Sequence, residues 1–232
     1  MSHSFMNRFP FFMANALAAS VILLAGCGGD DEPEPVPNLD AYAAVDLGLP
    51  SGMLWAEYNV GAHRPEEAGQ HFAWAEASAK TDYTWASYSH CEGSAYDFTK
   101  YCMSAKYGEV DGQREVSTHD DAATVLWGAP WRMPTRDEMD ELRTSCEWTA
   151  DTVGGTAGFR VVGQNGNSIF LPTTGYREAG ELTGAATSGY YWTGGLAAKD
   201  SLAYSLYFYT RPSLESTERY LGKAIRAVRM AE

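Results

Sequence analysis

The sequence predicts an α+β fold, with two helices near the middle of the chain and antiparallel strands after them. Helix start signals precede residues 122 and 136, and after residue 158 short apolar runs alternate with turn residues. Residues 57–115 show little hydrophobic periodicity and are rich in Gly, Ser, Tyr and Trp, which favours long loops. Helices followed by strands, without an internal repeat, are typical of α+β folds and not of solenoids or propellers.

The first folded segment is predicted to be a strand, a turn and a second strand. Residues 45–49 and 53–56 are largely apolar, and Pro50, Ser51 and Gly52 between them favour a turn. We expect only short elements in the long segment that follows, including one over residues 72–76.

Two helices are predicted from their capping residues. Residues 117–121 end in Asp-Asp and precede an apolar run over 122–127, so an Asp or the Thr of this segment can cap a helix that Gly128 and Pro130 end. Thr135, with Glu138 three residues later, forms the capping-box pattern of a second helix. In that helix Met139, Leu142 and Cys146 fall on one face.

The last third is predicted to be β-structure. Residues 159–163 and 168–171 are expected to form a hairpin around the turn 164–167, which contains Asn-Gly. Residues 172–189 are rich in Gly, Thr and Ala and are expected to form a long loop. Further strands are expected over the segments 190–193, 203–209 and 223–229.

The first 26 residues are predicted to be a signal peptide, and Cys27 the lipid-bearing first residue of the mature protein. Residues 9–26 carry no charge and are mostly apolar, a length that suits the core of a signal peptide and is marginal for a membrane span. Leu24-Ala25-Gly26-Cys27 resembles the lipobox of bacterial lipoproteins. An acylated Cys27 would anchor the protein to a membrane without a spanning helix.

Residues 27–40 are predicted to be an extended tether. Residues 28–38 contain three prolines and four acidic residues, and such a segment cannot bury a core. An acidic run just after the lipid-bearing Cys resembles the surface-export signal of Bacteroidetes lipoproteins. We therefore expect an outer-membrane, lipid-anchored protein displayed on the cell surface. The alternative is an ordinary linker that faces the periplasm.

Charge and cysteines narrow the classes of partner. Residues 1–26 contain one charged residue, Arg8, so their removal changes the net charge from −13 to −14, which argues against nucleic acid and anionic lipid surfaces as partners. Residues 41–232 are about one domain's worth of chain. They hold three cysteines, Cys91, Cys102 and Cys146, from which we expect a single structural disulfide without a specified pair. The third cysteine would be free or would pair between chains.

A family resemblance covers residues 45–230. Seven segments in order resemble the Fibrobacter succinogenes major paralogous domain, a module of many Bacteroidetes surface lipoproteins: residues 45–55, 71–76, 120–123, 131–142, 167–177, 190–193 and 225–229. The resemblance implies a C-type-lectin-like fold, with two helices followed by a small antiparallel sheet and long loops. It implies no specific activity.

Catalytic and metal chemistry find little support in the sequence. Arg132-Met133-Pro134-Thr135 also resembles formylglycine-generating enzymes, but their chemistry needs a late cysteine pair and no Cys follows Cys146. No G-x-S-x-G motif is present. Calcium-dependent lectin motifs, Glu-Pro-Asn or Gln-Pro-Asp followed by Trp-Asn-Asp, are also absent. We therefore predict no enzyme activity, no cofactor and no metal site.

The candidate binding residues are aromatic. Tyr176, Arg177, Tyr190, Tyr191 and Trp192 flank the expected loop 172–189, and exposed Tyr, Trp and Arg are typical of binding hot spots. Tyr190 and Trp192 would share one face of a strand and Tyr191 the other, so at least one of the three is expected in the core.

These observations favour a non-catalytic binding or adhesion module with a glycan or protein ligand. One alternative is a structural or assembly subunit of an envelope or fibre complex. The other is a cryptic enzyme.

Overall fold

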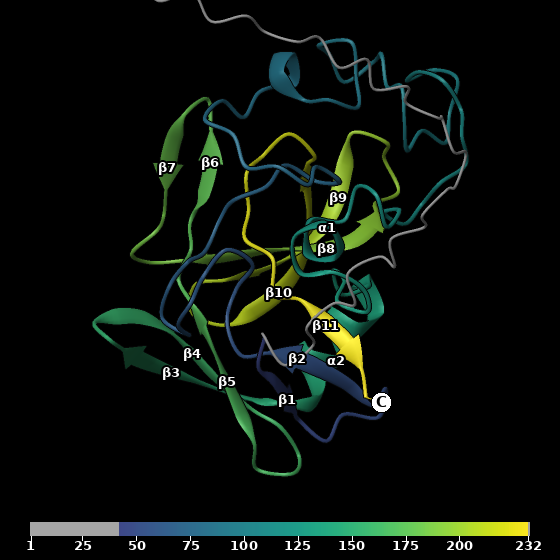
Figure 1. Ribbon diagram of the computed structural model, residues 1–232. Coiled ribbons are helices and arrows are strands. Elements are labelled where there is room, and N and C mark those ends of the chain that lie inside the picture. The colour runs from purple at the N-terminus through teal and green to yellow at the C-terminus, as the bar shows by residue number, and fades with distance from the viewer. Residues whose placement is uncertain (1–41, 232) are drawn as a thin grey trace, which may run out of the picture. The chain divides into compact units, whose positions relative to one another are not determined.

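The computed structural model describes residues 42–231, which form two α-helices and eleven strands (Figure 1). The predicted signal peptide, Cys27 and the whole predicted tether lie outside the described residues. Within residues 42–231 no helix is long and apolar enough to cross a membrane. The predicted α+β class is confirmed, because few helices combine with several small antiparallel sheets.

Four small sheets make up the β-structure, and every pairing within them is antiparallel. Their strand orders are β1-β2-β11, β3-β4-β5, β6-β7 and β10-β9-β8. The strands span β1 Ala44–Asp46, β2 Met53–Ala56, β3 Glu147–Val153, β4 Thr156–Val162, β5 Ser168–Pro172, β6 Tyr176–Glu178, β7 Glu181–Thr183, β8 Gly189–Leu196, β9 Leu202–Phe208, β10 Pro212–Glu218 and β11 Val228–Met230.

Both helices begin at the predicted capping segments. Helix α1 (Ala122–Trp127) starts at Asp121, whose carboxylate accepts from the amides of Ala123 and Thr124 at 2.9 and 3.2 Å. The other oxygen of Asp121 accepts from the amide of Met133 at 2.8 Å, so one side chain caps α1 and holds the segment before the next helix.

Helix α2 (Arg136–Ser145) carries the predicted capping box between Thr135 and Glu138. Met139 and Leu142 are buried as expected, and Cys146 is the residue that ends the helix. The Glu138 carboxylate also binds the Arg132 guanidinium with two hydrogen bonds, at 2.6 and 2.8 Å. This ion pair ties the start of α2 to the segment that precedes it.

The structure adds strands that the sequence did not predict. Residues 172–189 are not one long loop, since they contain the β6-β7 hairpin, and β3 and β10 were also missed. Most residues of β3, β7 and β10 are exposed or half-buried, so they lack the apolar pattern that marks a strand. Residues 223–229 form a strand only from Val228; before it, Lys223 and Ala224 pair through single bridges.

The segment before α1 has little regular structure, as predicted, apart from isolated bridges and a short 3₁₀ helix (Trp85–Ser87). The buried Arg219 holds it in place. The Arg219 guanidinium donates to the Tyr88 hydroxyl and to the carbonyls of Lys100, Tyr101 and Asp200, all at 2.9–3.0 Å. Aromatic rings surround the cation, with centroids between 4.3 and 5.9 Å away: Trp74, Tyr88, Phe98 and Tyr101.

The C-terminal segment, residues 222–230, runs through the centre of the fold (yellow in Figure 1). Ile225 and Ala227 pack in a core cluster with Trp74, Trp131 and Trp192. Ala224 and Val228 pack in a second cluster with Trp55, Leu142 and Tyr191. The segment therefore joins two halves of the hydrophobic core.

Arg226, in the middle of this segment, is fully buried. Its guanidinium donates to the Asn59 side-chain oxygen at 2.8 Å and to the carbonyls of Ala56, Glu57 and Phe170 at 2.9–3.1 Å. Burial lowers the pKa of Arg226 to about 10, which still leaves it protonated at neutral pH. A buried cation is tolerated only when such oxygens surround it, so these contacts bind the last segment to β2 and β5.

We predict that Arg226→Met destabilises the fold by about 3 kcal/mol or more, because four oxygens, three of them in buried hydrogen bonds, lose their donor. Urea denaturation measures the change in the free energy of unfolding. The control is Arg211→Met, at an exposed position, which should change stability by less than about 0.5 kcal/mol. Equal effects of the two substitutions would contradict the role given to Arg226.

Candidate functional site

Three tyrosines from neighbouring strands form an aromatic cluster beside β6. The Tyr176 and Tyr190 rings meet edge to face, with centroids 5.1 Å apart. The Tyr190 and Tyr207 rings are tilted, with centroids 4.9 Å apart, where β8 pairs with β9. All three side chains are half-buried, so each has part of its ring available to solvent.

A pocket of about 290 Å³ opens beside this cluster. Its walls combine tyrosine rings with carboxylates from β6 and β10 and a lysine: Tyr176, Tyr190, Tyr220, Glu178, Glu215, Glu218 and Lys223. The Tyr220 hydroxyl donates to the Glu178 carboxylate at 2.7 Å, and burial together with this contact raises the pKa of Tyr220. Rings beside carboxylate acceptors can hold the apolar face of a ligand and accept hydrogen bonds from its hydroxyl or amino groups.

Lys223 lies behind the tyrosines and is fully buried. Its ammonium group donates to the hydroxyls of Ser205 and Thr217 and lies 4.3 Å from the ring centroid of Trp192. Among residues 42–231, no carboxylate lies within 4.0 Å of it. Burial lowers the pKa of Lys223 to about 7, and the charges of Glu215 and Glu218 only partly oppose this.

The backbone around Lys223 explains how β6 and β8 reach the same pocket. Gly222 exchanges two backbone hydrogen bonds with Arg177 of β6, at 2.7 and 2.9 Å. Ala224 donates to the carbonyl of Tyr190 and accepts from the amide of Trp192, both in β8. Residues 222–224 therefore lie between the two strands and set their spacing.

Arg177 lines a different pocket from its two neighbours in β6. Successive residues of a strand point to opposite faces, so Tyr176 and Glu178 line the tyrosine pocket. Arg177 lines a pocket formed with residues 69–71, 79–81, Tyr83 and Gly180. The predicted set therefore divides between two sites.

Tyr191 and Trp192 are not surface residues, and their prediction as exposed ligand contacts is wrong. Both are fully buried. The Tyr191 hydroxyl donates to the Pro172 carbonyl at 2.6 Å, and the Trp192 indole donates to the Phe72 carbonyl at 2.8 Å. Strand alternation would leave one face in solvent if only one face of β8 were covered, but core clusters cover both faces here.

The predicted disulfide is not formed, since Cys91, Cys102 and Cys146 are all free thiols. Cys91 and Cys102 belong to a small cluster under the residue 83–107 loops, where their thiols donate to the carbonyls of Trp85 and Ser104. Cys146 ends α2 and packs against another cluster, and burial raises the pKa of its thiol to about 11.

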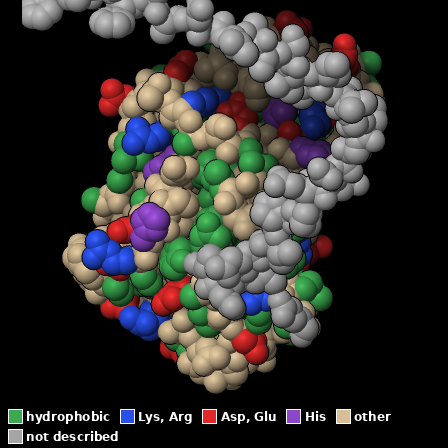
Figure 2. Space-filling model, viewed as in Figure 1, with side chains coloured by type: hydrophobic (Ala, Val, Ile, Leu, Met, Phe, Trp, Pro, Cys, Tyr) green, Lys and Arg blue, Asp and Glu red, His purple; other side chains and the backbone are tan. Residues whose placement is uncertain are grey.

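Charge alone does not mark the site. On the face shown in Figure 2, acidic and basic side chains are interspersed among hydrophobic and neutral ones. Within the part of the chain that the structure describes, no group of three or more His, Cys, Asp or Glu residues could hold a metal ion.

No protein-family model matches the chain, and neither a curated protein nor a solved structure matches it. The family resemblance therefore stays a prediction.

Sequence reasoning missed the acidic wall and the lysine of the tyrosine pocket. Glu178 had a weak signal, because it lies two residues after Tyr176 and shares its face in any strand. Glu215, Glu218 and Tyr220 lie on or after the unpredicted strand β10. Lys223 was assigned to a strand, but its burial depends on contacts that no local pattern reveals.

We predict that Lys223 makes stability depend on pH. Its folded pKa of about 7 lies below its ordinary value, so between these values the unfolded chain binds a proton that the folded chain does not. The free energy of unfolding should therefore rise with pH, by up to about 1.4 kcal/mol per pH unit, relative to a Lys223→Met variant.

Urea denaturation between about pH 7.5 and about pH 9.5 measures this difference. Lys199→Met, at an exposed position, is the matched control. Its free energy of unfolding should change with pH in parallel with that of the wild type. If the free energy of unfolding of Lys223→Met also changed with pH in parallel with the wild type, the buried amine would keep an ordinary pKa.

Proposed function

We propose that the protein is a cell-surface lipoprotein that acts as a non-catalytic binding or adhesion module, with a glycan or protein ligand. The observation that carries the proposal is the tyrosine pocket, in which Tyr176, Tyr190 and Tyr220 meet carboxylates from β6 and β10. Aromatic rings beside hydrogen-bonding groups suit both a sugar face and a protein hot spot.

The proposal includes a C-type-lectin-like fold of the Fibrobacter succinogenes major paralogous domain type. Two helices precede most of the strands, and long loops lie on a compact core, which agrees with this architecture. Loops and short hairpins on a rigid frame are where binding residues commonly lie. Both predicted tyrosines that reach the surface, Tyr176 and Tyr190, border the β6-β7 hairpin region.

We further propose that a lipid on Cys27 anchors the protein in the outer membrane and that residues 28–40 hold the domain away from it. The support is the lipobox-like segment that ends at Cys27 and the acidic, proline-rich composition that follows.

The binding proposal predicts that Tyr190→Ala weakens ligand binding at least tenfold, because truncation of a hot-spot aromatic residue typically costs about 2 kcal/mol. The full chain, purified in mild detergent, is tested on a glycan array and a panel of host-matrix proteins. Hits are then measured by biolayer interferometry. Tyr209→Ala, at an exposed tyrosine outside this pocket, is the matched control. A folded protein that binds nothing on either panel would refute the proposal.

The anchoring proposal predicts that Cys27→Ser abolishes labelling with a palmitate analogue and releases the protein from the membrane fraction. It also predicts that protease treatment of intact cells releases peptides from residues 42–231 while a periplasmic marker stays intact. Release only after lysis would place the domain in the periplasm and favour an assembly role there.

A further inference from the structure

The pocket on the Arg177 side of β6 has a different chemistry from the tyrosine pocket. It has a volume of about 370 Å³, at the lower end of the range for small-molecule sites. Its polar lining comes from Arg177, Lys80, His71, Gln70, Thr81 and Tyr83, with no Asp or Glu among the lining residues. Each of the other four pockets described carries at least one carboxylate. In a chain of net charge −13, a pocket without carboxylates therefore differs in charge from the other pockets.

The Arg177 guanidinium carries the uncompensated charge of this pocket. The side chain is half-buried, and among residues 42–231 it has neither a carboxylate within 4.0 Å nor a side-chain hydrogen bond. Its neighbour Glu178 is on the opposite face of β6, bound to Tyr220. A half-buried cation that the protein leaves unpaired is a position where an anionic ligand gains a charge-assisted contact.

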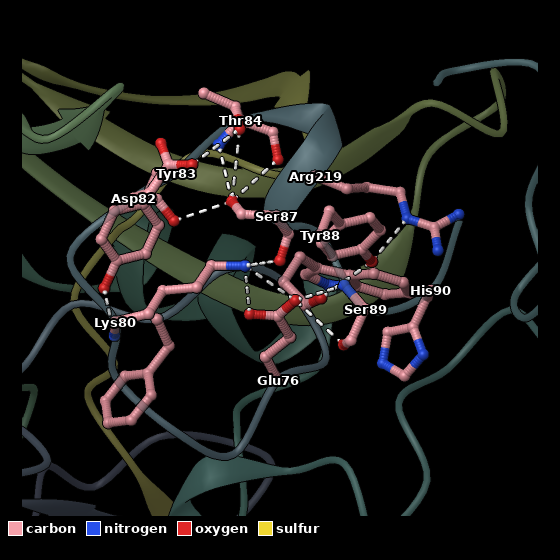
Figure 3. A network of polar contacts seen from close by, with 12 residues as sticks. Glu76, Lys80, Asp82, Tyr83, Thr84, Ser87, Tyr88, Ser89, His90 and Arg219 are labelled. Carbon is pink, nitrogen blue, oxygen red and sulfur yellow. Dashed lines mark hydrogen bonds and ion pairs between the residues drawn. The ribbon is translucent and has the colours of Figure 1, made fainter. Parts of the chain in front are cut away.

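The other two basic side chains of this pocket, Lys80 and His71, already have partners within the protein. Lys80 donates to the Glu76 carboxylate at 2.9 Å and to the Ser87 carbonyl at 2.7 Å, so its charge is balanced within the protein (Figure 3). His71 is buried and its ring nitrogen Nε2 donates to the Thr174 carbonyl at 3.0 Å. Burial lowers the pKa of His71, with a further contribution from the Arg177 charge, so the ring is neutral at pH 7.

The walls of the pocket are fixed before any ligand arrives. The Tyr83 hydroxyl donates to the His71 carbonyl at 2.6 Å and accepts from the amide of Lys80 at 3.2 Å. The turn of the β6-β7 hairpin is bound to the same residue, since the amide of Ala179 donates to the Tyr83 carbonyl at 3.0 Å. A rigid frame lowers the entropy lost when a ligand binds.

Two neutral polar side chains complete the lining. The Gln70 amide and the Thr81 hydroxyl are exposed, and neither forms a side-chain hydrogen bond with the described residues. They can donate to and accept from ring hydroxyls beside a charged group.

We propose that this pocket binds an acidic sugar residue, with the planar fork of Arg177 holding its carboxylate through two hydrogen bonds. The planar guanidinium matches a carboxylate bidentately, which a lysine ammonium cannot do. The polar side chains contact the sugar hydroxyls, which favours a uronic acid over an acidic peptide side chain. This inference rests on the proposed binding function and names one class of its ligands.

The test uses the full chain, purified in mild detergent, and D-glucuronate as the probe, followed by ligand-observed NMR. Glucuronamide, the same sugar with a neutral carboxamide, is the matched ligand control. We expect glucuronate to bind and glucuronamide to bind at least tenfold more weakly, in line with the strength of a charge-assisted hydrogen-bond pair. Equal binding of the two sugars would overturn the inference.

Two variants at Arg177 locate the binding. Arg177→Gln keeps the length of the side chain and the backbone bonds to Gly222, and it should weaken glucuronate binding about tenfold or more. Arg177→Lys keeps the charge without the fork and should fall between that variant and the wild type. Unfolding curves confirm that both variants fold. Unchanged binding in Arg177→Gln, or no binding of glucuronate to the wild type, would overturn the inference.

Tyr190→Ala separates this inference from the proposed function. Glucuronate binding that survives Tyr190→Ala but not Arg177→Gln assigns it to the Arg177 pocket. Conversely, a protein whose other ligands depend on Tyr190 but which fails to bind glucuronate retains the proposed function and loses only this inference.

Discussion

The fold depends on two guanidinium groups that are buried without a carboxylate partner among the described residues. Arg219 and Arg226 each occupy a site where neutral oxygens from distant segments converge. A buried cation excludes most alternative packings. Any arrangement that misplaces one of these carbonyls leaves the guanidinium charge and the carbonyl dipole without a partner. Arg219 fixes the irregular segment before α1, and Arg226 fixes the end of β2 and the middle of β5. Between them lie residues 222–224, which set the spacing of β6 and β8 and hence of both candidate pockets.

The two pockets differ in chemistry because one short strand separates them. Tyr176 and Glu178 of β6 contribute a ring and a carboxylate on one side, and Arg177 contributes a guanidinium on the other. Gly222 holds this strand through two backbone hydrogen bonds with Arg177, and the bond of Ala179 to the Tyr83 carbonyl holds the turn that follows it. The two pockets therefore lie on opposite faces of β6 and offer different chemical groups.

Local signals in the sequence predicted the helices and the best-marked hairpins. Thr135 with Glu138, and the Asp at position 121, act through contacts within a few residues, so their patterns identify helix starts without tertiary information. Asn165-Gly166 did the same for the β4-β5 turn, where Gly166 has φ of +85°. Strands β3, β7 and β10 gave no such signal, since none of their residues is buried. The burial of Tyr191, Trp192 and Lys223 likewise follows from segments far away in the chain, which no pattern in a single sequence identifies.

The central position of residues 222–230 has a consequence for how the protein folds. Residues 222–230 contribute to both halves of the core, although many of their partners lie far away in the sequence. Contacts as distant in sequence as that of Arg226 with Ala56 form slowly, because a long stretch of chain must be closed before they are made. Because one segment completes both halves of the core, we expect the two halves to unfold together in a single cooperative transition.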